Sequence, residues 1–211
     1  HHTVWGAISR AIRTPARSER SVTYYVTPPP FVTASAIPLL IQARGNPNFG
    51  SEELVAYELG YRVQPHPRLQ LDIAAFYHDY DDLWSATLLP LEIGMSPSAE
   101  PYLLFPATPQ NNAYGETYGV EVAATWQPLD AWRWQAGYTF LKLNLHTRGP
   151  MRSVAEDAET SNPQHQVFLR SEMDLGRHVE WGLGLRYVDC LPSLKVPRYL
   201  GLDTRLAWKP N

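Results

Sequence analysis

Cysteine is almost absent from this sequence, because Cys190 is the only one among 211 residues. A single thiol cannot form an internal disulfide, and no CxxC pair offers the spacing of a cysteine metal site. The sequence therefore excludes a small scaffold held together by disulfides. We interpret Cys190 as a half-buried residue inside a strand.

Long apolar runs and a surplus of positive charge are also missing. No stretch reaches the roughly 18 apolar residues of a transmembrane helix, and no signal peptide opens the chain, whose His1 and His2 are either a tag remnant or native. The net charge of −3 gives no electrostatic case for nucleic acid as a partner. A membrane barrel remains open, because its alternating strands escape averaged hydropathy.

Catalytic motifs are missing as well. The sequence contains no nucleophile elbow, no Gly-rich phosphate loop, no HExxH and no Ser/His/Asp spacing that supports a triad. We therefore expect no enzyme activity, no cofactor and no resident metal site.

Proline, tyrosine and tryptophan are abundant instead, with 19, 12 and 7 copies. Proline collects in turns because it can neither continue a helix nor donate to a β-ladder. This count indicates many short elements separated by turns and argues against a helical bundle.

Hydrophobic residues recur with a period of two, which places them on one face of a strand. The clearest case is 131–141, where Trp132, Trp134 and Tyr138 share a face while Arg133 and Gln135 share the other. The same alternation predicts about eight strands in an antiparallel up-and-down meander. They are expected at 3–10, 55–63, 69–78, 117–127, 131–141, 166–175, 181–187 and 200–208.

Short and long connectors alternate between these strands. The short ones are expected at 64–68, 128–131 and 176–178, and the long ones at 14–50, 83–113, 146–163 and, less long, 190–197. A transmembrane barrel has tight turns at one rim and long loops at the other. A soluble sandwich has no reason to keep this order.

Aromatic residues gather at the two ends of the expected strands. Tryptophan lies near the short turns and tyrosine near the long loops, as bilayer interfaces select. We assign the face of Val120, Val122 and Trp126 to lipid, and the charged face to the interior. The alternative is a soluble β-sandwich with aromatic cross-strand pairs. The residues concerned are Trp126, Trp132, Trp134, Trp181 and Trp208 at one end, and Tyr77, Tyr80, Tyr118, Tyr138 and Tyr187 at the other.

Several segments resemble the TonB-dependent outer-membrane receptors. The most specific is GNPNFGSEELVAYELGYR at 45–62, and the match continues in order through WGAISRAIRTPAR, LQLDIAAFYHDYDDL, YGETYGVEVAATWQP, NPQHQVFLRS and VPRYLGLDTRLAWKP. The resemblance covers essentially the whole chain.

That resemblance implies an all-β, 22-stranded barrel in the bacterial outer membrane, closed by an N-terminal plug domain. Such receptors import ferric siderophores, vitamin B12 or similar scarce nutrients, with energy from the TonB complex. Residues 1–211 contain no plug, TonB box or terminal aromatic strand, so we expect an internal segment of about eight strands from the C-terminal half of the barrel, which transports nothing alone. A passive outer-membrane channel or adhesin barrel is the alternative within the membrane class.

The resemblance also directs attention to the outer loops as ligand contacts. Arg44, Tyr80, Trp84 and Tyr102 are our candidates there, through charge pairing and stacking on a siderophore. The acidic groups at 78–82 and 156–159 fit hard cations, but a solvated rim explains them better.

Overall fold

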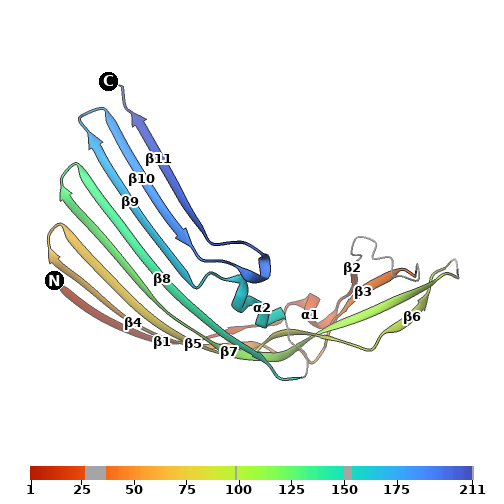
Figure 1. Ribbon diagram of the computed structural model, residues 1–211. Helices are drawn as coiled ribbons and strands as arrows, with labels where there is room; N and C mark the ends of the chain where they lie inside the picture. Colours follow the sequence, from red (N-terminus) through yellow and green to blue (C-terminus); the bar gives the residue numbers. More distant parts are fainter. Residues whose placement is uncertain (27–36, 98, 150–153, 211) are drawn as a thin grey trace.

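The computed structural model describes residues 1–26, 37–97, 99–149 and 154–210. Figure 1 shows one curved, open sheet, whose main path runs β1-β4-β5-β7-β8-β9-β10-β11 with every neighbouring pair antiparallel. The prediction of an all-β antiparallel meander of about eight strands is therefore confirmed. The strands are β1 (His2–Arg13), β4 (Glu52–His66), β5 (Leu69–Leu88), β7 (Pro101–Leu129), β8 (Trp132–Thr147), β9 (His165–Leu175), β10 (Val179–Val188) and β11 (Tyr199–Trp208).

Tight turns join β4 to β5, β7 to β8 and β9 to β10 at one rim, which Figure 1 shows on the same side as both termini. Arg68 in the first turn donates to the Pro128 carbonyl at 2.9 Å and pairs with Asp130 at 2.8 Å. Both partners belong to the second turn, so neighbouring turns are tied together. The three short connectors lie where the sequence predicts them.

The opposite rim, called here the outer rim, carries the longer connectors. They contain α1 (Arg17–Ser21), β2 (Thr23–Val26), β3 (Leu39–Arg44), α2 (Val154–Ser161) and the 3-10 turn η1 (Pro192–Leu194). Parts of two predicted loops, 27–36 and 150–153, fall outside the described residues. Within the described residues, no helix is long and apolar enough to cross a membrane.

The expectation of a loop at 83–113 is wrong. β5 continues to Leu88 and β7 begins at Pro101, with β6 (Glu92–Met95) paired to β7 between them. β3 adds a parallel pair to the other side of β7, from Leu39 opposite Leu103 to Ala43 opposite Ala107. Prolines interrupt the period-two pattern in this stretch, so the sequence does not reveal these strands. Hydrogen-bonded pairing with strands from distant parts of the chain stabilises them. Residues 83–113 together with β2 and β3 are called here the outer extension, which projects from the sheet in Figure 1.

The remaining strand segments, called here the wall, have two chemically different faces. The register places Leu59, Ala75, Val120 and Phe140 side by side across β4, β5, β7 and β8. We call this the apolar face; it includes Val4, Ile8, Leu59, Ile73, Val120, Val122, Trp126, Leu169, Leu185, Leu202 and Leu206. The opposite, polar face includes Arg62, Asp72, Glu121, Arg133, Arg170, Glu172, Asp174, Glu180, Arg186, Asp203 and Arg205.

No second layer covers the apolar face among the described residues. Val4, Ile8 and Leu206 are 70%, 76% and 73% exposed, which water would penalise over so large a surface. A soluble antiparallel sheet packs its apolar face inward, so the β-sandwich alternative is wrong. Within the described residues, the apolar face is therefore left without a protein cover.

Aromatic residues mark both ends of the apolar face. Trp126 and Trp134 are direct cross-strand partners near the tight turns, and the rings of Trp132 and Trp134 lie 5.4 Å apart. Towards the outer rim, the rings of Tyr57 and Tyr77 lie 6.3 Å apart. The two predicted belts are therefore present on one face of the sheet. Tyr80 is the exception, because its register with Leu54 and Gly115 places it on the polar face.

Aromatic side chains cover glycines on the polar face. A Cβ added to Gly60 would lie 2.0 Å from the Trp5 ring, and one added to Gly137 would lie 2.1 Å from the Phe168 ring. Each aromatic residue is the direct cross-strand partner of its glycine. Such pairs restore the packing that a glycine lacks and help to hold the strand register.

Cys190 lies outside the strands, so the expectation that it sits half-buried in one is wrong. β10 ends at Val188, and the Cys190 amide donates to the side chain of Asp189 at 2.8 Å. The thiol is free and exposed. An aspartate that caps its neighbour's amide ends the strand locally.

Candidate functional site

The outer extension is an ordered platform with its own small core. Phe49, Pro106 and Ser85 are the largest fully buried side chains, all in or beside the extension. Asn111 stabilises the base of the extension. Its side-chain oxygen accepts a hydrogen bond from the Gly50 amide at 2.7 Å, and its side-chain nitrogen donates one to the Asp82 carbonyl at 2.7 Å. The extension can therefore present side chains at defined positions beyond the wall.

Arg44 is the last residue of β3, and its guanidinium faces β6. Its guanidinium donates to Gln42 Oε1 at 2.6 and 3.0 Å and pairs with Glu92 at 3.3 Å. The side chain is 38% exposed, so the guanidinium keeps donors available to solvent. A planar fork oriented in this way suits a carboxylate or a catecholate-like anion.

Tyr102 belongs to the same part of the extension as Arg44. It pairs with Gly94 across β6 and β7, and a Cβ at Gly94 would lie 2.2 Å from the Tyr102 ring. Gly94 lies two residues after Glu92, the partner of Arg44. The structure thus places these two candidates on the same face of the outer extension, near Glu92 and Gly94 of β6.

Tyr80 and Trp84 lie further down β5, near the wall. The Tyr80 hydroxyl is 3.5 Å from His78 Nδ1, and the Trp84 amide donates to Glu52 at 2.8 Å. A bulge with Asp82 at φ 54° separates the two residues. In the part of the chain that the structure describes, no hydrogen bond or ion pair joins the four candidates into one cluster.

The acidic group at 78–82 is held by an arginine that the sequence analysis did not select. Arg148 pairs with Asp81 and, at 3.1 Å, with Asp82, and its guanidinium lies 5.0 Å from the centre of the Tyr114 ring. The hydrogen bond that Arg148 donates to Asp81 is the main cause of the raised pKa of Arg148. Among the described residues, no group of His, Cys, Asp and Glu could hold a metal ion.

Two acidic residues of the 146–163 connector take part in hydrogen bonds that involve the backbone. Glu159 of α2 accepts the Leu145 amide of β8 at 2.5 Å, and the carbonyl of Asp157 accepts the Ser161 hydroxyl at 2.7 Å. The Glu159 contact docks α2 onto the outer end of β8, whereas the Asp157 contact lies within α2 and uses the backbone carbonyl. The sequence analysis interpreted this acidic run as a solvated rim, and Glu159 instead helps to hold the connector in place.

Gln42, Glu92 and Arg148 are therefore the residues of the outer rim that sequence reasoning missed. Arg44 and Glu92 are 48 residues apart, and Arg148 and Asp81 are 67 apart. No local spacing signals such contacts, because they depend on which strands become neighbours.

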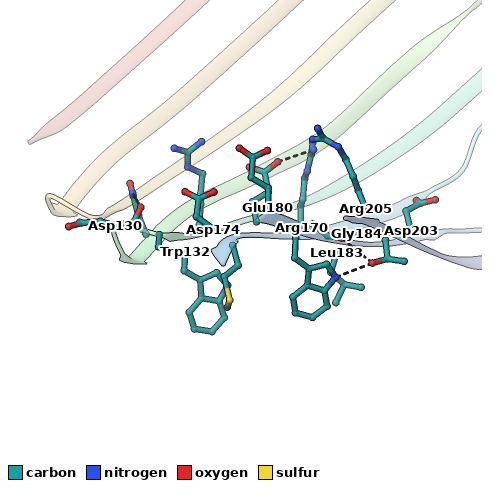
Figure 2. A pocket seen from close by; sticks show the side chains of 17 residues that line it. Asp130, Trp132, Arg170, Asp174, Glu180, Leu183, Gly184, Asp203 and Arg205 are labelled. Atoms are coloured by element: carbon teal, nitrogen blue, oxygen red, sulfur yellow. Dashed lines mark hydrogen bonds and ion pairs between the residues drawn. The ribbon is translucent and has the colours of Figure 1, made fainter. Parts of the chain in front are cut away.

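The polar face forms a charged hollow of about 480 Å³ near the tight turns, lined from β8, β9, β10 and β11. Figure 2 shows Asp174, Glu180 and Arg205 on one side of the sheet and Trp132 and Leu183 on the other. Ion pairs within it join Arg170 to Glu172 at 2.9 Å and Glu180 to Lys209. This surface is suited to polar protein or water and not to lipid.

Comparison with known proteins gives a family and a set of folds. The model of the TonB-dependent receptor-like β-barrel matches residues 1–211. The siderophore receptor PirA of Acinetobacter baumannii has a TM-score of 0.71 at 15% identity, over 100% of this chain and 33% of its own. PirA of Pseudomonas aeruginosa has a TM-score of 0.63 at 16% identity, over 100% and 34%.

A variant of the ferric enterobactin receptor PfeA of Pseudomonas aeruginosa, in complex with enterobactin, is also similar. Its TM-score is 0.60 at 16% identity, over 89% of this chain and 26% of that one. No curated protein sequence matches this chain. The chain thus spans about a quarter to a third of the length of these solved structures, and at such identities the likeness shows the fold alone.

Proposed function

Because this chain belongs to the TonB-dependent receptor family, we propose that it is a wall segment of a receptor that actively takes up a ferric siderophore or a similar scarce nutrient. The family is one of outer-membrane β-barrel receptors. The whole receptor's transport activity is proposed here from a segment about one third as long as its solved relatives.

The apolar face supports a location in the bacterial outer membrane. From Tyr118 to Trp126 the strand rises about 19 Å, at ~3.3 Å per residue and a tilt near ~45°, which is comparable with a ~25 Å apolar band. Aromatic rings flank this stretch at both ends. Outer-membrane lipid is therefore the proposed partner of the apolar face.

The polar face is proposed to line the barrel interior, where the receptor's own N-terminal plug domain is its partner. Its acidic and basic side chains, several of them in ion pairs, suit contact with a polar protein surface rather than with lipid. The TonB complex acts through the receptor's N-terminal part, which is outside residues 1–211. We expect no enzyme activity and no resident cofactor in this segment.

The outer extension is proposed to capture the nutrient. The observation that carries this proposal is the partly exposed side chain of Arg44 on the same face of the extension as Tyr102. Ferric siderophores are commonly anionic and planar in part, so a surface with both a cation and an aromatic ring suits them. Tyr80 and Trp84, lower on β5, would contact ligand on its way from the extension towards the interior. Iron enters here as cargo.

The test uses the full-length receptor in a strain that lacks it. Uptake of radioactive ferric iron is measured with a panel of purified siderophores, with and without a working TonB protein. We expect uptake of at least one ferric siderophore that requires both the receptor and TonB. Uptake that persists without TonB would support the passive channel instead, and no uptake with any member of the panel would contradict the proposed cargo.

A further inference from the structure

Lys142 stands where the apolar face of β8 ends at the outer rim. The apolar face of this strand runs through Trp134, Ala136, Tyr138 and Phe140 before it reaches Lys142. The eight residues from Trp134 to Lys142 rise roughly 19 Å at ~3.3 Å per residue and a ~45° tilt. Lys142 is thus the first charged residue of β8 beyond the apolar stretch, at the level of a lipid headgroup.

Aromatic rings surround Lys142 on the same face. Its direct partner on β7 is Tyr118, and Phe140, two residues away, pairs with His165 on β9. The rings of Tyr138 and His165 stack with centres 6.1 Å apart, and the Tyr138 hydroxyl lies 2.9 Å from His165 Nδ1. This contact orients the imidazole and leaves Nε2 as its remaining polar atom.

Lys142 differs from Arg10 and Arg148 because no carboxylate neutralises it within the described residues. Arg10 on the same face pairs with Glu53 at 2.6 Å, and Arg148 pairs with Asp82 at 3.1 Å. No hydrogen bond or ion pair engages the Lys142 ammonium within the described residues. Its charge therefore has no counter-ion supplied by the described protein.

One acid of this face near Lys142 is already engaged. Glu116, opposite Asn144, accepts hydrogen bonds from the Tyr77 hydroxyl at 2.8 Å and from the Asn144 amide at 3.1 Å. Both carboxylate oxygens are thus held by partners other than Lys142. Within the described residues, the ammonium is left to pair with an anion from outside.

We propose that Lys142 and His165 bind a phosphate monoester on the headgroup of an outer-leaflet lipid, with Phe140 and Tyr118 packing against the lipid beside it. A lysine at the end of a membrane span extends its ammonium to the headgroups, where it pairs with an anionic lipid. The site rests on the proposed outer-membrane location but is separate from nutrient capture at the outer extension.

The experiment titrates the purified full-length receptor in detergent with bisphosphorylated lipid A and with the same lipid freed of both phosphates. Binding is followed by native mass spectrometry. We expect wild type to prefer the phosphorylated form, Lys142→Gln to bind that form about fivefold more weakly, and Lys142→Glu to lose the preference. Arg133→Gln is the matched control, because Arg133 lies on the polar face of the same strand and its loss should change nothing.

Three outcomes would overturn the proposal. One is equal binding of both lipid forms by wild type, and another is an unchanged preference in Lys142→Gln. The third is displacement of the lipid by inorganic phosphate alone at millimolar concentration, which would mean a site for free phosphate. Siderophore uptake by Lys142→Gln should match uptake by wild type. A wild-type receptor that fractionates to the outer membrane and transports normally, but binds both lipid forms equally, would refute this site and leave the proposed function standing.

Discussion

The wall and the outer extension are parts of one sheet, yet they are specified in different ways. In the wall, each strand alternates apolar and polar residues and pairs with its neighbour in sequence. In the extension, β3 lies parallel to β7 more than sixty residues away, and prolines interrupt the pattern. A strand with an apolar medium on one side must alternate with a period of two, whereas an element that packs on itself needs no such period.

The largest effect is expected from a charge on the apolar face of the wall. Val122→Asp would bury a carboxylate in the bilayer between Ile73 and Tyr138, at a cost that we expect to prevent outer-membrane assembly of the full-length protein. Heat-modifiable migration and membrane fractionation measure this. Glu121→Gln, one residue away on the polar face, should assemble normally, and equal tolerance at both positions would break the assignment of faces.

Next comes the core of the extension. Phe49 is 2% exposed, and Phe49→Ala should cost the extension about 3–5 kcal/mol. Limited proteolysis should then cut the extension while the wall keeps its heat-modifiable migration. Tyr24→Ala, which removes a half-exposed ring, serves as the control and should leave the digestion pattern unchanged. Loss of the whole barrel in Phe49→Ala would show that the two regions fold as one unit.

Backbone clearance on the polar face gives a smaller effect within the wall. A Cβ at Gly119 would lie 2.2 Å from the Phe140 carbonyl oxygen, whereas one at Gly184 would have no neighbour closer than 3.8 Å. Gly119→Ala should therefore lower the stability of the receptor by about 1–3 kcal/mol. The urea midpoint of the barrel measures it. Gly184→Ala should stay near wild type, and a reversed order would contradict the register between β7 and β8.

Arg44 tests whether the extension has the proposed binding role. Arg44→Gln removes the charge that faces Glu92 and solvent, and we expect about tenfold weaker binding of the transported ferric siderophore. Fluorescence quenching on the purified full-length receptor gives the affinity. Arg17→Gln removes an exposed charge from α1 as a control. If both variants bind like wild type, the guanidinium of Arg44 does not contact ligand.

The smallest effect concerns the connector that leaves β1. A hydrogen bond from Arg13 is the main cause that holds the pKa of Glu19 below its usual range. A lowered folded pKa stabilises the folded form at and above the unfolded pKa, and this contribution disappears as pH falls through the folded value. The pair is partly exposed, so we expect less than about 1 kcal/mol. Protease sensitivity of α1 should rise below about pH 4 in wild type but be independent of pH over this range in Glu19→Gln.

The candidate site was predictable only in part. Arg44 and Tyr102 follow from residue type and expected loop position, and the fold does bring them to one surface. Glu92, the partner of Arg44, could not be found, because their contact requires β3 and β6 both to lie beside β7. The sequence analysis assigned Tyr80 to the tyrosine belt from its place along the strand, but the strand register puts Tyr80 on the polar face.

The pattern of residues along the chain was enough to predict the wall: its eight strands, its tight turns and the apolar face of Val122, which we propose meets lipid. Alternation is a local property, and an apolar medium on one side of a strand makes it obligatory. Tertiary structure alone decided the outer extension, the pairing of Arg148 with Asp81 and Asp82, and the absence of any carboxylate beside Lys142 in the described residues. Those features depend on which distant strands become neighbours in the sheet. The pattern of residues within one strand does not show which distant strand will lie beside it.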